Sequence, residues 1–196
     1  LVDLPDHGRS PWTDSFGYAA MADAIADDIS ERMGSAASLA VVGHSLGGKV
    51  AMQLALRHPH LVRALVVVDI APDDSSHGYG FGRLLRSMRH LDLATLTSRS
   101  DADQRLRPAV PDAVVRGFLL QNLHRSGGTF HWQPNLDLLL EALPAISGWP
   151  ATRGIYDGPV LQLRGGESEY VRDEHAEPMR ALFPRVRLVT VPGAGH

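Results

Sequence analysis

The chain has 196 residues, of which 44% are hydrophobic and 21% charged, and its formal net charge is -3. These values are typical of a globular domain with a core of its own and not of a disordered segment. The small negative charge, without a basic stripe, argues against a nucleic-acid partner held by phosphate contacts. There is no cysteine, and no apolar run approaches the roughly 20 residues that a membrane-spanning helix needs. We expect a cytoplasmic protein without a membrane span.

The first part of the chain alternates between short apolar runs and helical patterns. Residues 1–4 look like the end of a strand, and residues 16–33 carry apolar side chains close to helical spacing, with Gly34 as a C-terminal cap. The continuous apolar run 39–42 predicts a strand buried in a parallel sheet, and the spacing of apolar residues up to Arg57 predicts a helix directly after it. A second buried strand is predicted at 65–68.

The middle of the chain breaks this alternation. Helical patterns occur at 82–90, 112–123 and 135–143, but no further buried strand is evident there. Strand patterns at 159–163 and 186–191, with a helical pattern at 174–183 between them, then resume the sheet. This order predicts an inserted helical cap between two parts of one core.

These elements predict an α/β fold with a mainly parallel sheet, helices on both faces and an inserted helical cap. We expect residues 1–72 to form the first part of the core, 73–150 the cap and 151–196 the second part of the core. Both ends look truncated, because the chain starts at Leu1 inside an expected strand and stops at His196 in a loop.

The turn after the first buried strand reads Gly43-His44-Ser45-Leu46-Gly47, which matches the pattern G-x-S-x-G. In a nucleophile elbow of this kind the serine projects above the sheet in a strained conformation, and Gly43 and Gly47 are expected to let strand and helix close over it. Ser45 is therefore the candidate nucleophile. The backbone N–H of Leu46, at the positive end of the helix dipole, is the candidate oxyanion donor.

A serine hydroxyl needs a histidine to take its proton and an acid to orient that histidine. His196 is the candidate base, since it follows the last predicted strand at the sheet edge where catalytic groups gather; His44 is a weaker alternative. The other histidines are expected at the surface or in the cap: His7, His58, His60, His77, His90, His124, His131 and His175. His58-x-His60 has no third ligand nearby in the sequence, so we expect no metal site.

Two residues compete for the role of the acid. Asp69 ends the predicted strand 65–68, and Glu169 lies in the loop after the following strand of the sheet. Both positions are suitable for an acid that orients His196. The residues by themselves favour Asp69 and leave Glu169 open as the alternative.

Several segments together carry a family resemblance. They are 3–10 (DLPDHGRS), 42–51 (VGHSLGGKVA), 66–72 (VVVDIAP) and 192–196 (PGAGH). With them the chain resembles the α/β-hydrolase superfamily, and more narrowly its branch of small bacterial YbfF-type esterases and abhydrolase domain-containing protein 11. The resemblance implies hydrolysis of carboxylic ester or thioester bonds without a cofactor, and it strengthens the preference for Asp69.

The resemblance also implies a second oxyanion donor from a loop that would precede Leu1. On this interpretation the natural protein is longer and active, and the 196 residues alone are expected to be unstable or nearly inert.

The expected activity passes through an acyl-enzyme on Ser45, with a small-molecule ester or thioester of small to medium acyl length as substrate and the oligomeric state left open. Candidate substrate-binding residues are His44, Phe81, Leu85, Phe118 and Trp132, most of them apolar cap residues. Lys49 is expected to be solvated. The alternatives are cofactor-free haloperoxidase or acyltransferase chemistry on the same residues, or a binding protein that keeps the fold without catalysis.

Overall fold

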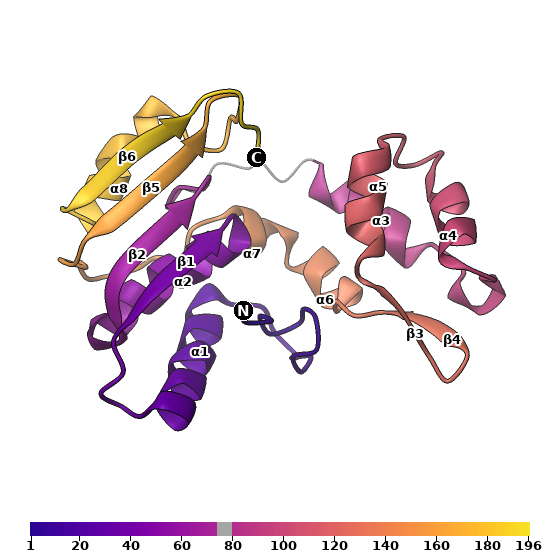
Figure 1. Cartoon of the computed structure of the whole chain (residues 1–196), viewed down its shortest axis with the longest axis horizontal. Coiled ribbons are helices and arrows are strands. Elements are labelled where there is room, and N and C mark those ends of the chain that lie inside the picture. Colours follow the sequence, from indigo (N-terminus) through magenta and orange to yellow (C-terminus); the bar gives the residue numbers. More distant parts are fainter. Residues whose placement is uncertain (74–79) are drawn as a thin grey trace. The chain divides into compact units, whose positions relative to one another are not determined.

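The computed structural model of this protein describes residues 1–73 and 80–196. The chain forms two compact units (Figure 1), each described here by itself. Unit 1 comprises Leu1–Phe16 with Ser76–Ser147, and unit 2 comprises Gly17–Ser75 with Gly148–His196. The first 16 residues thus belong with the segment expected to be the cap; the division at 72/73 and 150/151 stays a prediction.

Unit 2 is built on a parallel sheet of four strands in the order β1-β2-β5-β6. The strands are β1 (Leu39–His44), β2 (Val62–Val68), β5 (Val160–Gly165) and β6 (Val186–Val191), and they confirm the four strands predicted for the core. His44 lies opposite Val68, and Val68 lies opposite Leu163. Because all strands run in parallel, the residues that follow β1, β2 and β5 meet at one edge of the sheet.

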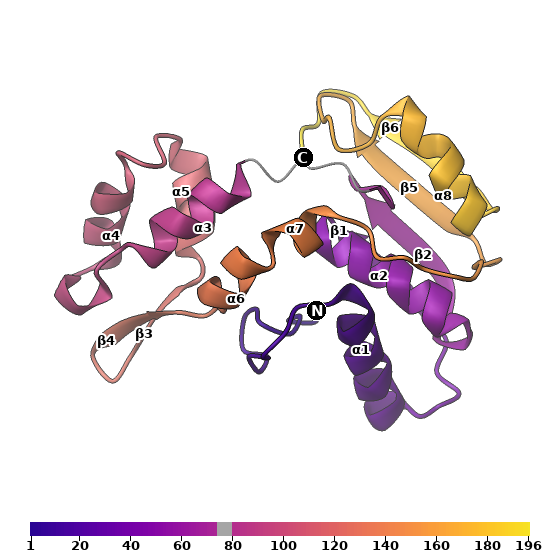
Figure 2. The same ribbon diagram turned by 180° about the vertical axis from the view of Figure 1, so that it is seen from behind.

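Three helices belong to unit 2: α1 (Tyr18–Met33), α2 (Leu46–Arg57) and α8 (Ala176–Leu182). Figure 1 and, from behind, Figure 2 show α2 and α8 on the same face of the sheet, and α1 packs against α2. The side chains between this face and the helices form the core of the unit, among them Leu54, Leu65 and Phe183, which are at most 1% exposed.

We expected helices on both faces of the sheet. Among the described residues, the helices of unit 2 lie on one face only. Val42, on the opposite face, is 68% exposed. The physical reason is the strand order, which advances across the sheet in one direction from β1 to β6. Right-handed crossovers between parallel strands then place every connecting helix on the same side.

Lys49 is buried, and the expectation of a solvated side chain is wrong. It is 4% exposed, and its Nζ donates to the carbonyl oxygen of Gly148 at 2.7 Å. The ammonium group also lies 5.6 Å from the centre of the Tyr18 ring, an arrangement typical of a cation–π contact. Lys49 therefore connects α2 to α1 and to the segment that leads toward β5.

Unit 1 contains the predicted helices together with elements that the sequence did not reveal. The helices are α3 (Phe81–Arg89), α4 (Arg99–Leu106), α5 (Ala113–Leu120), α6 (Leu136–Glu141) and α7 (Leu143–Ser147). Short 3-10 helices complete the two units: η3 (Leu93–Thr95) in unit 1, and η1 (Pro59–Leu61) and η4 (Asp173–His175) in unit 2. The helices predicted at 82–90, 112–123 and 135–143 are confirmed, whereas α4 was not predicted.

Unit 1 also contains an antiparallel hairpin of β3 (Leu123–Ser126) and β4 (Thr129–Trp132), so it is not purely helical. Gly127 and Gly128 form the turn, both with positive φ (58° and 86°), as a tight hairpin requires. Leu123 and Trp132 pair across the hairpin and join the buried core of the unit.

Residues 1–4 form no strand, which corrects our expectation. A strand exists only where its backbone pairs with a neighbour, and no described strand pairs with this segment. The following loop is instead fixed by Asp6, which is fully buried. The Asp6 carboxylate accepts hydrogen bonds from the N–H and hydroxyl of Thr13 and from the Asn135 amide, at 2.7 to 3.1 Å. No helix that the structure describes is long and apolar enough to span a membrane.

Candidate active site

Ser45 lies in the turn between β1 and α2. Its φ of 53° and ψ of -121° belong to a region that residues other than glycine rarely adopt. Its N–H donates to the carbonyl oxygen of Val68 at 3.0 Å. This hydrogen bond ties the strained turn to the end of the neighbouring strand β2.

The close approach of β1 and α2 depends on Gly43 and Gly48. A Cβ at Gly43 would collide with the carbonyl group of Gly47, and one at Gly48 would lie 2.6 Å from Cγ2 of Ile70. Gly47 has no atom within 4 Å of such a Cβ. The pattern G-x-S-x-G predicts that Gly43 and Gly47 are needed, but the packing needs Gly43 and Gly48.

Asp69 follows β2 and is 2% exposed. Its φ of 52° is again in the left-handed region. Its Oδ1 accepts a hydrogen bond from the Gly165 N–H at 3.0 Å, and its Oδ2 accepts one from the Ser168 hydroxyl at 2.5 Å. Burial by itself raises the pKa of Asp69, but the hydrogen bonds from Ser168, Gly165 and His196 outweigh it and hold the pKa below its ordinary value. The carboxylate is therefore ionised at neutral pH.

His196 lies between Asp69 and Ser45. Its Nδ1 is 2.7 Å from Asp69 Oδ2, and its Nε2 is 2.9 Å from Ser45 Oγ. Since Asp69 is ionised, it accepts a hydrogen bond from the N–H at Nδ1, and the lone pair of Nε2 is left to accept the hydrogen bond of the Ser45 hydroxyl. Glu169 is exposed, and no described hydrogen bond or ion pair joins it to His196. The structure brings Asp69, and not Glu169, to the histidine.

Ser168 is a residue of this site that the sequence analysis missed. Besides donating to Asp69, its Oγ accepts a hydrogen bond from the Tyr170 N–H at 3.2 Å. Glu169 was the expected acid in the loop after β5, whereas the residue of this loop that contacts Asp69 is the neighbouring serine. A serine in a loop is too common to stand out, so no signal in the sequence identifies it.

Two aromatic rings flank the imidazole of His196. The Tyr170 ring is stacked on it, with centroids 3.7 Å apart and planes 20° from parallel. The His44 ring lies 4.8 Å away, tilted by 39°. Loss of hydration, followed by repulsion from His196, lowers the pKa of His44, which favours its neutral form. His44 was expected at the site, but Tyr170 was not.

The other expected substrate-binding residues lie in unit 1. Phe81 and Phe118 are exposed, by 40% and 63%, and Leu85 is half-buried against the core of that unit. Trp132 is a member of this core, and its indole N–H donates to the carbonyl oxygen of Met88 at 2.9 Å. Trp132 therefore contributes to packing. A role in substrate binding stays a prediction for Trp132 as for Phe81, Leu85 and Phe118.

In the described part of the chain, none of the remaining histidines forms a hydrogen bond or ring contact with His196, and one of them departs from its expected exposure. His175 is buried, and its Nδ1 accepts a hydrogen bond from the Arg172 N–H at 3.1 Å. His58 lies 2.7 Å from a carboxylate oxygen of Asp23. Within the described part of the chain, no group of three or more histidine or acidic side chains could hold a metal ion. His77 lies outside the described residues.

Comparison with known proteins places this geometry in a family. The whole chain, residues 1–196, matches the family described as alpha/beta hydrolase fold. The chain belongs to this family. Its resemblance to the branch of YbfF and abhydrolase domain-containing protein 11 is also confirmed by two curated relatives and one solved structure.

The chain is 40% identical to the Mus musculus protein named sn-1-specific diacylglycerol lipase ABHD11, over 100% of the chain and 64% of that protein. It is 30% identical to Esterase YbfF of Escherichia coli (strain K12), over 100% of the chain and 74% of that protein. The solved structure titled Marine microorganism esterase matches with a TM-score of 0.94 and 30% identity, over 100% of the chain and 77% of that structure. The chain therefore spans less than two thirds of the length of its mouse relative.

The packing at the elbow predicts different effects for two neighbouring glycines. Gly43→Ala should lower the free energy of unfolding by about 1–3 kcal/mol, because the new methyl group overpacks against the backbone of α2. Gly47→Ala, the matched control, should leave stability unchanged or slightly increased, since the space is open and alanine favours a helix. Urea unfolding measures both. Equal stability of the two variants would contradict this account of the turn.

Ser168→Ala should destabilise the protein in a pH-dependent way. Because the folded-state pKa of Asp69 is depressed, its hydrogen bonds stabilise the fold above the ordinary aspartate pKa of about 3.9, and this contribution is lost as the pH falls through the folded-state pKa. The variant should lose about 1.5–3 kcal/mol of unfolding free energy at pH 7, with a difference that shrinks on acidification. Ser168→Thr keeps a hydroxyl and should show a smaller loss. Urea unfolding across this pH range measures the difference. If the unfolding free energy of Ser168→Ala equalled that of wild type at every pH, the proposed contribution of the Ser168 hydrogen bond would be refuted.

Proposed function

We propose that this protein is a serine hydrolase that cleaves carboxylic ester or thioester bonds through an acyl-enzyme on Ser45. The observation that carries the proposal is the position of His196, with Nε2 2.9 Å from the Ser45 hydroxyl and Nδ1 2.7 Å from the Asp69 carboxylate. Nucleophile, base and orienting acid are then within hydrogen-bond reach of one another, as this chemistry requires.

In the first step, Ser45 Oγ attacks the acyl carbonyl carbon while its proton passes to His196 Nε2. The imidazolium that forms donates from Nδ1 to the ionised Asp69, which stabilises it. The carbonyl oxygen becomes an oxyanion, and the N–H of Leu46 donates to it. Leu46 is the first residue of α2, and the first N–H groups of a helix have no partner within the helix.

Acylation is completed when His196 Nε2 gives the proton taken from Ser45 to the departing alcohol or thiol, and the acyl group stays on Ser45. In deacylation a water molecule attacks the acyl carbon while His196 Nε2 takes its proton as general base. The bond from the acyl carbon to Ser45 Oγ then breaks and Nε2 returns the proton to Oγ. The products are the carboxylic acid and free Ser45, so the reaction as written needs no external oxidant.

Two curated relatives support the reaction class. The mouse relative is named a diacylglycerol lipase and the Escherichia coli relative an esterase, and both names describe cleavage of carboxylic esters. We propose the same bond type for this protein, with small to medium acyl groups.

Labelling with a fluorophosphonate tests the proposal. The Ser45 oxygen displaces fluoride from phosphorus and His196 takes the hydroxyl proton, so one adduct on Ser45 is expected by peptide mass spectrometry. The adduct should be absent in Ser45→Ala. Wild-type protein that melts cooperatively and still forms no adduct would argue for a binding protein that shares the fold.

The identity of the acid is tested separately. Asp69→Asn should slow fluorophosphonate labelling and p-nitrophenyl ester hydrolysis by a factor on the order of 10²–10⁴, because the histidine loses its orienting charge. Glu169→Gln removes the alternative acid and should react at the wild-type rate. The reverse result, with Glu169→Gln inactive and Asp69→Asn unaffected, would assign the acid to Glu169.

A further inference from the structure

Unit 1 contains a cavity of about 500 Å³ that is widely open to solvent, and none of the residues proposed for catalysis lines it. Arg83, Arg86 and His90 from α3 and its C-terminal end line it, together with Arg105 near the end of α4. Its volume lies in the range of small-molecule sites. The lining is unusual because three guanidinium groups from two helices share one cavity.

The register of α3 explains why its basic residues face the cavity. Arg83, Arg86 and His90 recur at spacings of three and four residues, which places them on one face of the helix. Leu84, Leu85 and Met88 belong to the opposite face and pack in or against the core of unit 1. Because the apolar side of α3 packs on the core of unit 1, Arg83, Arg86 and His90 on the other side line the cavity.

Arg83 and Arg86 differ in their charge environment from the third arginine of α3, Arg89. Among the residues that the structure describes, no carboxylate forms an ion pair with Arg83 or Arg86. Arg89 on the same helix differs, since it pairs with Asp137 at 2.5 Å and does not line the cavity. The cavity thus contains two guanidinium groups whose charge is not compensated within the described structure.

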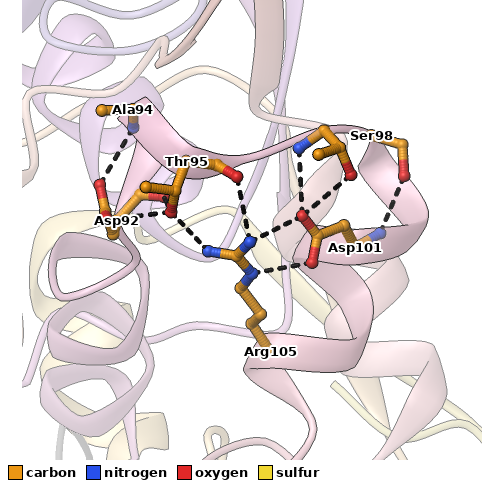
Figure 3. A network of polar contacts seen from close by, with 7 residues as sticks. Asp92, Ala94, Thr95, Ser98, Asp101 and Arg105 are labelled. Carbon is orange, nitrogen blue, oxygen red and sulfur yellow. Dashed lines mark hydrogen bonds and ion pairs between the residues drawn. The ribbon is translucent and has the colours of Figure 1, made fainter.

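Arg105 is held in a fixed orientation, as Figure 3 shows. Its Nε and Nη2 donate to the two Asp101 oxygens at 2.8 and 2.9 Å, Nη1 donates to Thr95 Oγ1 at 2.7 Å, and Nη2 donates to the Thr95 carbonyl at 3.0 Å. A guanidinium group has five N–H donors, so one at Nη1 remains available. Arg105 is therefore a pre-positioned donor whose charge is already balanced by Asp101.

Asp92 is an acidic residue that lines the cavity. Its carboxylate accepts hydrogen bonds from the Ala94 N–H at 3.1 Å and from the Thr95 hydroxyl at 3.0 Å (Figure 3). It caps η3 and forms no ion pair with Arg83 or Arg86 among the described residues.

We propose that this cavity binds a ligand that carries a phosphate group, with Arg83 and Arg86 as the charged contacts and Arg105 as a fixed donor. The planar fork of arginine matches the oxygens of phosphate and forms charge-assisted hydrogen bonds with them. The walls also include Leu91 and Leu106, which offer an apolar surface to the organic part of the ligand. Ser45 is not among the lining residues, and the inference goes beyond the proposed hydrolase activity.

The phosphate group can belong to a soluble phosphate ester or to a lipid headgroup, and the test has one arm for each source. In the first arm, isothermal titration calorimetry of the full chain at low ionic strength uses inorganic phosphate and phenyl phosphate. In the second arm, the chain is co-sedimented with phosphatidic acid vesicles and with phosphatidylcholine vesicles. Both arms compare wild type with Arg83→Gln/Arg86→Gln and with each single variant, and use Arg89→Gln as a control for the single variants that removes one positive charge from α3 outside the cavity.

We expect wild type and Arg89→Gln to bind phenyl phosphate more tightly than inorganic phosphate, and the double variant to bind about tenfold more weakly or worse. Binding only to phosphatidic acid vesicles, lost in the double variant, would support the site with a lipid headgroup as the source. Binding that survives in the double variant, or wild type that binds no probe, would overturn the proposal. If thermal melting shows that the double variant is unfolded, the single variants Arg83→Gln and Arg86→Gln decide instead, each with an intermediate loss expected.

Discussion

The close approach of β1 and α2 at Gly43 is the constraint on which the candidate active site depends. Because the carbonyl group of Gly47 occupies the space that a Cβ would need, only glycine fits there. The short turn forces Ser45 into the left-handed region with φ of 53°, and it places Ser45 immediately before the first residue of α2. Nucleophile and proposed oxyanion donor are thus consequences of one backbone contact.

The parallel sheet supplies the remaining groups from separate parts of the chain. Asp69 follows β2, and β5 ends in Gly165, whose N–H holds the Asp69 carboxylate. His196 lies in the loop after β6, 151 positions from Ser45, and still approaches it within 2.9 Å. Since the strands are parallel, their carboxyl ends lie at the same edge. Around this edge the hydrogen bonds from Ser168 and Gly165 keep Asp69 ionised in a buried position, and the Tyr170 and His44 rings flank His196.

Unit 1 has a core of its own and a different distribution of charge. Its apolar residues gather from α3 to α6, while Arg83 and Arg86 of α3 line a cavity. Arg105 and Arg116 are each held by an aspartate and by at least one backbone carbonyl oxygen, and Arg99 and Arg125 donate to backbone carbonyls. Arg83 and Arg86 depart from this pattern within the described structure, which is why we assign them to a ligand and not to the stability of the fold.

The sequence by itself determined what depends on neighbouring residues: the elbow at Ser45, the four core strands, most of the helices, and the candidates Asp69 and His196, which follow strands of a parallel sheet. Only the tertiary structure decided the features that depend on residues far apart in the chain. The choice between Asp69 and Glu169 as partner of His196, the contact from Ser168, the burial of Lys49 against Gly148, and the placement of helices on one face all rest on contacts between segments far apart in the chain. No local pattern encodes such contacts, because each arises only when strand order and register bring the segments together.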